Sequence, residues 1–352
     1  MWTKLERLEA VLHGEPADRP PVSAWRHFTD REHSGAADFA DAMLKFQEQY
    51  DWDYLKAQNR ATYYEEVWGG EFQYEDYEGG VVAPITKAPI TCAEDLEKIV
   101  EMPASAWPLA EQVEACRLLV DGVKDGTPIF NGVFCPAAIF QKMCAVFSIG
   151  RYRTATRSDL MVTLIKEHPV EVHRALKNIT RTMASYAQEL VKTGIYGIFY
   201  AATGLSRTGY LTKEEWEEFV KPYDLELIQA MKPLKIMVHD CGILCNPEWF
   251  ADYPIDILHW PESATGNPSL DSAPNWIGKI TPMGGCDERP FGQGQAEKIR
   301  RLTRATINKM KDIPFVLAPD CSISVNTSDA ELRAFIQAAH ESPDFDGKTF
   351  VL

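Results

Sequence analysis

The sequence predicts an α/β fold, a (β/α)8 barrel of the TIM type that spans residues 1–352 as a single domain. The first observation is the length, because 352 residues accommodate a barrel of about 250 residues with additional segments. The second is a pattern in which a short, apolar, β-rich run ends in small or polar residues and precedes a helical segment. This pattern occurs eight times, the number that the barrel requires, at Pro21–Phe28, Trp52–Ala57, Pro128–Phe134, Gly197–Ala202, Lys235–Cys241, Ile255–Trp260, Lys279–Gly285 and Phe315–Cys321. No linker, low-complexity tract or internal repeat divides the chain.

The segments around these runs carry helical patterns and capping signals. Residues 1–14 alternate apolar and charged side chains, which predicts an amphipathic N-terminal helix. Residues 160–193 repeat apolar side chains at helical spacing, Thr212 with Glu215 predicts a capping box, and residues 327–336 predict a capped closing helix. Residues 58–127 are less regular and predict an excursion over the barrel mouth, with an acidic stretch rich in aromatic residues: Tyr63, Tyr64, Trp68, Phe72, Tyr74 and Tyr77.

The charge balance excludes several classes of partner. Lys and Arg number 36 against 51 Asp and Glu, which gives a net charge of −15 and a pI near 5.0. Phosphate backbones and anionic lipid surfaces repel such a chain, so we expect neither nucleic-acid nor membrane binding. Residues 1–14 lack the apolar run of a signal peptide, and no apolar window reaches membrane-spanning length. We therefore expect a cytoplasmic protein whose eight cysteines stay reduced.

A His-x-Cys pattern at the end of the fifth predicted strand is the strongest chemical signal. His239 and Cys241 are two positions apart on a strand, so both side chains face the same side of the sheet. Cys321 ends the eighth predicted strand and approaches from across the barrel mouth, where barrel enzymes have their active sites. One imidazole and two thiolates suit Zn²⁺, and three protein ligands leave a fourth position open, as in catalytic sites. The alternative is that all three are ordinary core residues, since cysteine is among the most buried residue types.

The pattern of His239, Cys241 and Cys321 resembles the zinc motif of the methylcobamide:coenzyme M methyltransferases, within the uroporphyrinogen decarboxylase superfamily. Other segments resemble that superfamily across nearly the whole chain: Asp18–Val22, Gly197–Gly204, Phe219–Asp224, Gly266–Leu270, Gly284–Glu288 and Leu317–Thr327. The resemblance implies a TIM-type barrel and assigns the three residues as zinc ligands. It assigns no such role to the nearby Cys245 and Cys286.

Two departures separate the chain from the decarboxylase branch of that superfamily. In that branch, two arginines four residues apart hold the carboxylates of an octa-anionic tetrapyrrole, and an aspartate after the second strand holds its pyrrole nitrogens. Here residues 25–31 keep one arginine without the paired spacing, and the second predicted strand ends without the expected acid. The sequence therefore lacks both the anion clamp and the pyrrole anchor of a porphyrin decarboxylase.

The same strand ends predict a different substrate pocket. An aromatic site with a few cations suits a small anion or an aromatic ether and is too poor in cations for eight carboxylates. The residues expected to line it are Trp25, Arg26, Lys56, Arg60 and Tyr63, together with His27 and Tyr64. The alternative is that the aromatic residues pack in the core while Arg26 and Lys56 form ordinary ion pairs.

Three further residues at the same barrel end are candidate catalytic groups. Tyr200 lies near the end of the fourth predicted strand, and Asp287 and Glu288 follow the seventh. A carboxylate beside zinc would serve as a fourth ligand or take the proton of a bound thiol. Equally, either carboxylate would cap the next helix or pair with the neighbouring arginine. His27 and His259 are left out of the primary site, because a lone histidine near a strand end is more often a hydrogen-bonded core residue than a base.

The predicted activity is a zinc-dependent methyl transfer. A small-molecule thiol acceptor bound to zinc has a lowered pKa and, as a thiolate, attacks a methyl group carried by a corrinoid or another activated donor. We expect the corrinoid on a separate partner protein, because the chain has no Asp-x-His-x-x-Gly cobalamin-binding signature. Two alternatives stay open. One is a decarboxylase-like lyase that acts on a smaller acid, and the other is a non-catalytic barrel that binds a corrinoid or another small molecule.

Overall fold

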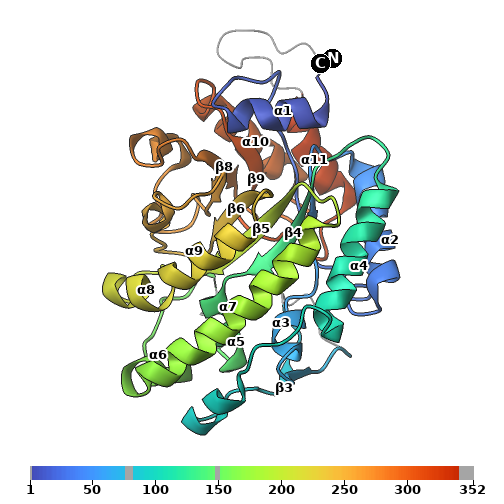
Figure 1. Cartoon of the computed structure of the whole chain (residues 1–352). Coiled ribbons are helices and arrows are strands. Elements are labelled where there is room, and N and C mark those ends of the chain that lie inside the picture. Colours follow the sequence, from blue (N-terminus) through green and yellow to red (C-terminus); the bar gives the residue numbers. More distant parts are fainter. Residues whose placement is uncertain (1, 76–81, 147–150, 341–352) are drawn as a thin grey trace.

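A computed structural model describes residues 2–75, 82–146 and 151–340, and Figure 1 shows the arrangement of its elements. Seven parallel strands form one curled sheet in the order β1-β4-β5-β6-β7-β8-β9. They are β1 (Leu55–Ala57), β4 (Ile129–Phe134), β5 (Gly197–Thr203), β6 (Lys235–Asp240), β7 (Ile257–His259), β8 (Thr281–Cys286) and β9 (Val316–Pro319). Two short strands outside this sheet, β2 (Glu71–Phe72) and β3 (Ile85–Lys87), pair antiparallel. The predicted α/β class is confirmed.

Helices alternate with the strands and cover the outer face of the sheet (Figure 1). Within the described ranges the α-helices are α1 (Lys4–Leu12), α2 (Ala36–Tyr50), α3 (Tyr63–Glu66), α4 (Trp107–Gly122), α5 (Pro136–Met143), α6 (Leu160–Glu167), α7 (Pro169–Val191), α8 (Lys213–Phe219), α9 (Lys221–Ala230), α10 (Ala296–Lys309) and α11 (Asp329–His340). The short 3-10 helices are η1 (Ala93–Lys98), η2 (Pro247–Phe250) and η3 (Leu270–Asn275). None of these described helices is both long enough and apolar enough to cross a membrane.

The two faces of the sheet contribute to two separate hydrophobic clusters. On β5, Phe199 and Ala201 belong to a cluster inside the curled sheet, whereas Ile198 and Tyr200 belong to a larger cluster beneath the helices. This division follows from the two-residue periodicity of a strand. The inner cluster includes residues of every strand from β4 to β9, so the concave face of the curled sheet has a packed hydrophobic core.

Helix α1 covers the N-terminal end of the sheet. Thr3 and Glu6 form a capping box at its first turn, and Leu8 and Val11 enter the inner cluster. The hydroxyl of Thr281, the first residue of β8, donates to the carbonyl of Val11 at 3.0 Å. The predicted N-terminal helix is therefore confirmed, and it lies at the end of the sheet opposite the strand C-termini.

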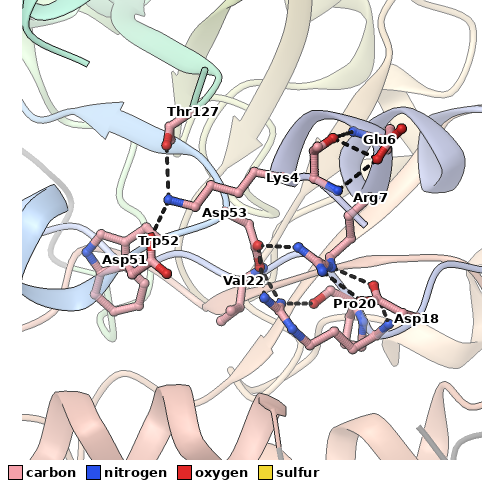
Figure 2. A network of polar contacts seen from close by, with 12 residues as sticks. Lys4, Glu6, Arg7, Asp18, Pro20, Val22, Asp51, Trp52, Asp53 and Thr127 are labelled. Carbon is pink, nitrogen blue, oxygen red and sulfur yellow. Dashed lines mark hydrogen bonds and ion pairs between the residues drawn. The ribbon is translucent and has the colours of Figure 1, made fainter. Parts of the chain in front are cut away.

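A buried ion-pair network joins α1 to the sheet (Figure 2). The carboxylate of Asp53 accepts hydrogen bonds from Arg7 at 2.7 Å, from the Val22 backbone N–H at 2.8 Å, and from Arg19. Arg7 also forms an ion pair with Asp18 at 2.6 Å. Asp53 thus connects α1, the segment that contains residues 18–22, and the start of β1.

The first predicted strand, Pro21–Phe28, is not a regular strand in the structure. Val22 forms an isolated parallel bridge with Leu317 of β9, and its carbonyl accepts a hydrogen bond from the Asp53 N–H at 3.0 Å. Two consecutive prolines precede Val22 and have no N–H group to donate to a ladder, which explains why the pairing is so short. Instead of eight strands, the sheet has seven strands and one bridging residue between its two ends.

The predicted helix over residues 160–193 is interrupted. Helix α6 ends at Glu167 and α7 starts at Pro169, with His168 between them at φ −133°. Proline has no N–H and disfavours helical backbone in the residue before it, so the apolar periodicity continues across a break. The capping box of Thr212 with Glu215 is confirmed at the start of α8.

Residues 58–127 contain more regular structure than predicted, including α3, the β2–β3 pair, η1 and the 16-residue helix α4. The hydroxyls of Tyr63 and Tyr64 donate to the carbonyl of Gly132 on β4 at 3.0 and 2.9 Å. The start of the excursion therefore packs against β4. Tyr77 of the predicted aromatic stretch lies outside the described residues.

Candidate metal centre and its cavity

The three predicted metal ligands meet at the C-terminal end of the sheet. His239 lies in β6, Cys241 follows that strand, and Cys321 follows β9. The sulfur atoms of Cys241 and Cys321 are 3.7 Å apart, and the Cys321 sulfur is 3.5 Å from Nε2 of His239. All three ligand atoms lie within 4.8 Å of one another. Within the described ranges, no other three His, Cys, Asp or Glu side chains form such a group.

The two shorter separations fit a tetrahedral zinc ion. Zinc–sulfur bonds of about 2.3 Å and a zinc–nitrogen bond of about 2.0 Å at tetrahedral angles require about 3.8 Å between sulfurs and about 3.5 Å from sulfur to nitrogen. The observed separations are 3.7 and 3.5 Å. A donor set of one imidazole and two thiols also suits zinc, and it leaves one coordination position for a small molecule.

A second histidine determines which nitrogen of His239 carries hydrogen. Nδ1 of His239 lies 2.8 Å from Nδ1 of His259, and Nε2 of His259 lies 3.1 Å from the Pro319 carbonyl. Burial lowers the pKa of His259 well below its ordinary value, so this ring is neutral. The carbonyl can only accept, so the single hydrogen of His259 is on Nε2 and its Nδ1 accepts from His239. His239 is thereby left with a lone pair on Nε2, the atom that faces the Cys321 sulfur.

The two thiols differ in acidity. The hydrogen bond from Cys241 and the positive charge of Arg151 lower the pKa of Cys321 well below its ordinary value. The same hydrogen bond, together with burial, raises the pKa of Cys241. Cys321 is therefore the first of the pair to ionise, and the thiolate is the form in which cysteine binds metals.

The three ligands line a cavity of about 400 Å³ at this end of the sheet. Its walls combine aromatic rings with cationic side chains: Trp25, Tyr64, Phe134, Tyr152 and Phe199 with Lys56, Lys142, Arg151 and Arg207. None of the described residues that line it is an aspartate or a glutamate. The volume suits a small molecule, and the charges favour an anionic one.

Comparison with known proteins identifies the family of this chain. The family model of uroporphyrinogen decarboxylase (URO-D) matches residues 3–342. The chain belongs to the URO-D family. A comparison with curated proteins gives no match.

Solved structures share the fold of this URO-D family member. A methyltransferase from Methanosarcina mazei superposes with a TM-score of 0.75 at 19% sequence identity, over 97% of this chain and 99% of that chain. A B12-independent methionine synthase from Shewanella sp. W3-18-1, in complex with selenomethionine, gives a TM-score of 0.54 at 13% identity, over 94% of each chain. At these identities the likeness shows the fold alone.

Of the residues expected to line the substrate pocket, the structure brings Trp25, His27, Lys56 and Tyr64 to the cavity. The Lys56 Nζ atom lies 4.6 Å from the centroid of the Phe199 ring and 5.9 Å from that of Trp25. Burial lowers the pKa of Lys56 to about 7, although the charges of Cys321 and Glu32 act in the opposite direction. Lys56 therefore presents a buried amine, rather than an ordinary ion pair, to the cavity.

Arg26, Arg60 and Tyr63 lie outside the cavity, which differs from the expected pocket. Arg26 donates to two backbone carbonyls in the segment after β9, at 3.1 and 3.2 Å. Arg60 is buried in ion pairs with Glu66, at 2.8 Å, and with Glu111. Tyr63 donates its hydroxyl to β4, as described above. Neighbouring residues of an extended chain point to opposite sides, so Trp25 and Arg26 do not line one pocket together.

Tyr200 and Asp287 are also placed differently from the predicted catalytic arrangement. Tyr200 faces the helices, and its hydroxyl donates to the buried carboxyl of Asp224 at 2.6 Å. Tyr200 does not face the cavity, because adjacent residues of a strand point to opposite sides and its neighbour Phe199 faces the cavity. Asp287 forms an ion pair with Arg289 at 2.7 Å, the arrangement weighed above as its alternative.

Glu288 lies behind the cavity wall. Its carboxylate accepts hydrogen bonds from Arg151 at 3.3 Å and from the Tyr152 hydroxyl. Burial and the charge of Cys321 raise the pKa of Glu288. Arg151 and Tyr152 line the cavity, whereas Glu288 does not. Glu288 therefore affects the site through its hydrogen bonds to these two side chains.

Several residues of the cavity wall were not predicted from the sequence: Gln58, Asn59, Gln141, Lys142, Arg151, Tyr152 and Arg207. All of them follow β1, β4 or β5 in the chain. Their position in the sequence could have indicated them, because residues that follow the strands of a barrel form its active-site end. Thr203 also lines the cavity, at φ +54° and beside an irregularity in the β5–β6 register. No sequence signal indicates that backbone conformation in a β-branched residue.

Proposed function

We propose that this URO-D family protein is a zinc-dependent methyltransferase that moves a methyl group to a thiol acceptor. The observation that carries the proposal is the set of His239, Cys241 and Cys321, whose donor atoms have zinc-like separations within a cavity of ligand size. Family membership and the fold shared with a methyltransferase support a methyl-transfer or URO-D-like reaction.

The residues of the chain provide the site for this reaction. His239, Cys241 and Cys321 would hold the zinc ion, which when bound lowers the pKa of a thiol ligand and keeps it as a thiolate. His259 keeps the lone pair of His239 on Nε2. The aromatic walls exclude water from the reacting atoms, and the cationic side chains attract an anionic substrate.

The donor in this proposal is a methylated corrinoid, carried by a separate partner protein, or another activated methyl compound. The cavity lies at the C-terminal end of the strands, whereas α1 packs against the interior at the opposite end.

We also propose that the sheet closes into a TIM-type barrel. The supporting contacts are the bridge of Val22 to Leu317 and the hydrogen bond of Asp53 to Val22.

Metal analysis and methyl-transfer assays test the proposed function. We expect the protein as purified to contain zinc, and Cys241→Ala and Cys321→Ala each to lose the metal and at least a hundredfold of the transfer from methylcobalamin to a thiol. Cys286→Ala is a matched control, because Cys286 is buried against Thr303, outside the metal group. Circular dichroism should show that all variants fold. A variant that loses zinc yet keeps full transfer activity would contradict the proposal.

A second candidate function is a lyase that removes carbon dioxide from a small acid. Membership of the URO-D family and the four cationic side chains of the cavity favour it. Release of carbon dioxide from carboxylic acids, unchanged in metal-free protein, would support this alternative over methyl transfer.

A further inference from the structure

The amine of Lys56 is buried, faces the cavity and forms one hydrogen bond within the described part of the chain. Lys56 is 5% exposed and lies on β1, with the rings of Trp25 and Phe199 beside it. One N–H of the amine is accepted by Oε1 of Gln58. Among the described residues, no other hydrogen-bond partner contacts this nitrogen. The rest of its bonding capacity is thus available to a molecule in the cavity.

A chain of buried hydrogen bonds orients this amine. Nε2 of Gln58 lies 2.7 Å from Nε2 of His27, and Nδ1 of His27 lies 2.8 Å from the carboxylate of Glu32. The Gln58 oxygen can only accept from Lys56, so its NH2 group donates to His27. His27 then carries its hydrogen on Nδ1 and donates it to Glu32. Each link has one donor and one acceptor, and all four side chains are no more than 6% exposed.

The groups around Lys56 permit both charge states of the amine near neutral pH. The charges that act on it come from Cys321 and Glu32, and the other titratable neighbours are the rings of His27 and His259. Burial opposes the two negative charges and lowers the pKa of Lys56 to about 7. A neutral amine in this position has a lone pair that can accept a proton.

We propose that Lys56 takes the proton of the acceptor thiol when that thiol binds in the cavity. Gln58, His27 and Glu32 are positioning residues, since they act through the amine that they hold toward the cavity. This inference rests on the proposed methyl transfer, and it adds the group that removes the thiol proton.

The transfer balances in atoms and charge. The S–H bond breaks, its proton forms an N–H bond with the Lys56 lone pair, and a thiolate and an ammonium result. A sulfur lone pair then forms the carbon–sulfur bond while the bond between methyl and donor breaks, and the electron pair of that bond leaves with the donor. If the donor leaves as an alkoxide or phenolate, the ammonium returns the proton to its oxygen. If a corrinoid leaves, Lys56 releases the proton to solvent.

Counting protons during thiol binding tests the role of Lys56 without turnover. Cobalt(II) replaces zinc, the thiolate-to-metal absorption band reports binding of 2-mercaptoethanol, and a pH-indicator dye reports released protons. Wild-type protein should release about one proton per bound thiol at pH 6, where Lys56 is already an ammonium, and almost none at pH 8. Lys56→Met and Lys56→Arg should release about one proton at both pH values, because neither side chain can take a proton.

The arginine variant separates proton transfer from charge alone. If Lys56 only supplies a positive charge, Lys56→Arg and wild type will release equal numbers of protons at pH 8, which overturns the inference. Lys235→Met is a control outside the cavity lining, because Lys235 at the start of β6 forms an ion pair with Asp256 at 3.3 Å. It should keep the wild-type proton count. A metal-loaded wild-type protein that binds no thiol would instead overturn the proposed function, and the role of Lys56 with it.

Discussion

At the scale of single residues, His259 forms a hydrogen bond that fixes the ring of the predicted metal ligand His239. Its Nδ1 accepts the hydrogen of His239 at 2.8 Å, within a buried pair of rings. His259→Leu removes that acceptor and leaves the Nδ1–H of His239 without a partner. We expect zinc affinity to fall ten- to a hundredfold, the usual effect of losing such a hydrogen bond. Competition with a chromophoric chelator measures it.

The control for this experiment is a histidine on the outer surface. His173 lies on α7, bonds to the Tyr223 hydroxyl at 2.8 Å and is remote from the cavity lining. His173→Leu should leave zinc affinity unchanged. Equal affinities of His259→Leu and wild type would show that the ring of His259 does not hold His239 in its metal-binding tautomer.

The same residues show what the sequence could and could not predict about the site. His239 and Cys241 were predictable as neighbours because strand periodicity is local. The partnership of His239 with His259 depends on the register of β6 against β7, which pairs these two residues directly. Register is a property of the assembled sheet, so a lone histidine near a strand end gave no sign of its partner.

At the scale of elements, Asp53 holds α1 and the segment that contains residues 18–22 against β1 (Figure 2). Its carboxylate is 1% exposed and is shared by Arg7 and Arg19. Asp53→Asn leaves the buried guanidinium of Arg7 and the partly buried guanidinium of Arg19 without their common anion. We expect a loss of about 3 kcal/mol in the free energy of unfolding, measured by urea denaturation.

A surface ion pair provides the comparison for Asp53. Asp38 lies 3.3 Å from Arg31, and its side chain is 53% exposed. Asp38→Asn should give the urea midpoint of wild type, since exposed pairs contribute little. If Asp53→Asn unfolds at the same urea concentration as this control, the network does not stabilise the position of α1.

The contact between β5, α9 and the segment after η2 contains a carboxyl group whose titration affects stability. Asp224 accepts hydrogen bonds from Tyr200 at 2.6 Å and Tyr253 at 3.1 Å, and burial raises its pKa from 3.8 to about 7. Between these pKa values the folded protein keeps a proton that the unfolded chain has released. Stability should therefore fall as pH rises through this window, by at most about 1.4 kcal/mol per pH unit for this group.

Asp224→Asn isolates that contribution. The variant has no carboxyl to titrate, so its free energy of unfolding should change less between pH 5 and pH 7 than that of wild type. Urea denaturation at pH 5, 6, 7 and 8 measures both profiles, and the difference should level off above pH 7, where Asp224 is ionised in both states. Parallel profiles across the whole range would mean that Asp224 keeps an ordinary pKa in the folded protein.

The prediction of helices and strands was most accurate where an apolar pattern repeats along the chain. It was least accurate where a single residue determines whether the backbone can continue an element. Seven of the eight predicted runs form strands of the sheet, because apolar runs separated by helical segments are characteristic of parallel sheets. The run at residues 21–28 fails because its backbone donors begin only after two prolines. A single proline likewise divides the predicted long helix into α6 and α7.

At the scale of the whole molecule, the charge of the surface and the charge of the cavity have opposite signs. The chain carries a net charge of −15, yet its described cavity wall has four Lys or Arg side chains and no carboxylate. Composition predicted the first property, but the second depends on β1 and on the segments after β4 and β5, which meet only in the folded chain. A negative molecule with a positive cavity favours a small anion inside the site over a polyanion along the surface.

This distribution of charge leads to a prediction that distinguishes the protein from the decarboxylases for which its family is named. Uroporphyrinogen carries eight carboxylates, and each buried carboxylate without a partner costs several kcal/mol. Four cationic side chains line the cavity, and Arg26 and Arg60 point away from it or are paired elsewhere. We therefore expect no measurable conversion of uroporphyrinogen to coproporphyrinogen, assayed by chromatography of the oxidised porphyrins, under conditions in which an authentic decarboxylase turns over. Coproporphyrinogen that forms with wild type and disappears with Lys56→Met would place this chain among the decarboxylases and exclude the methyltransferase proposal.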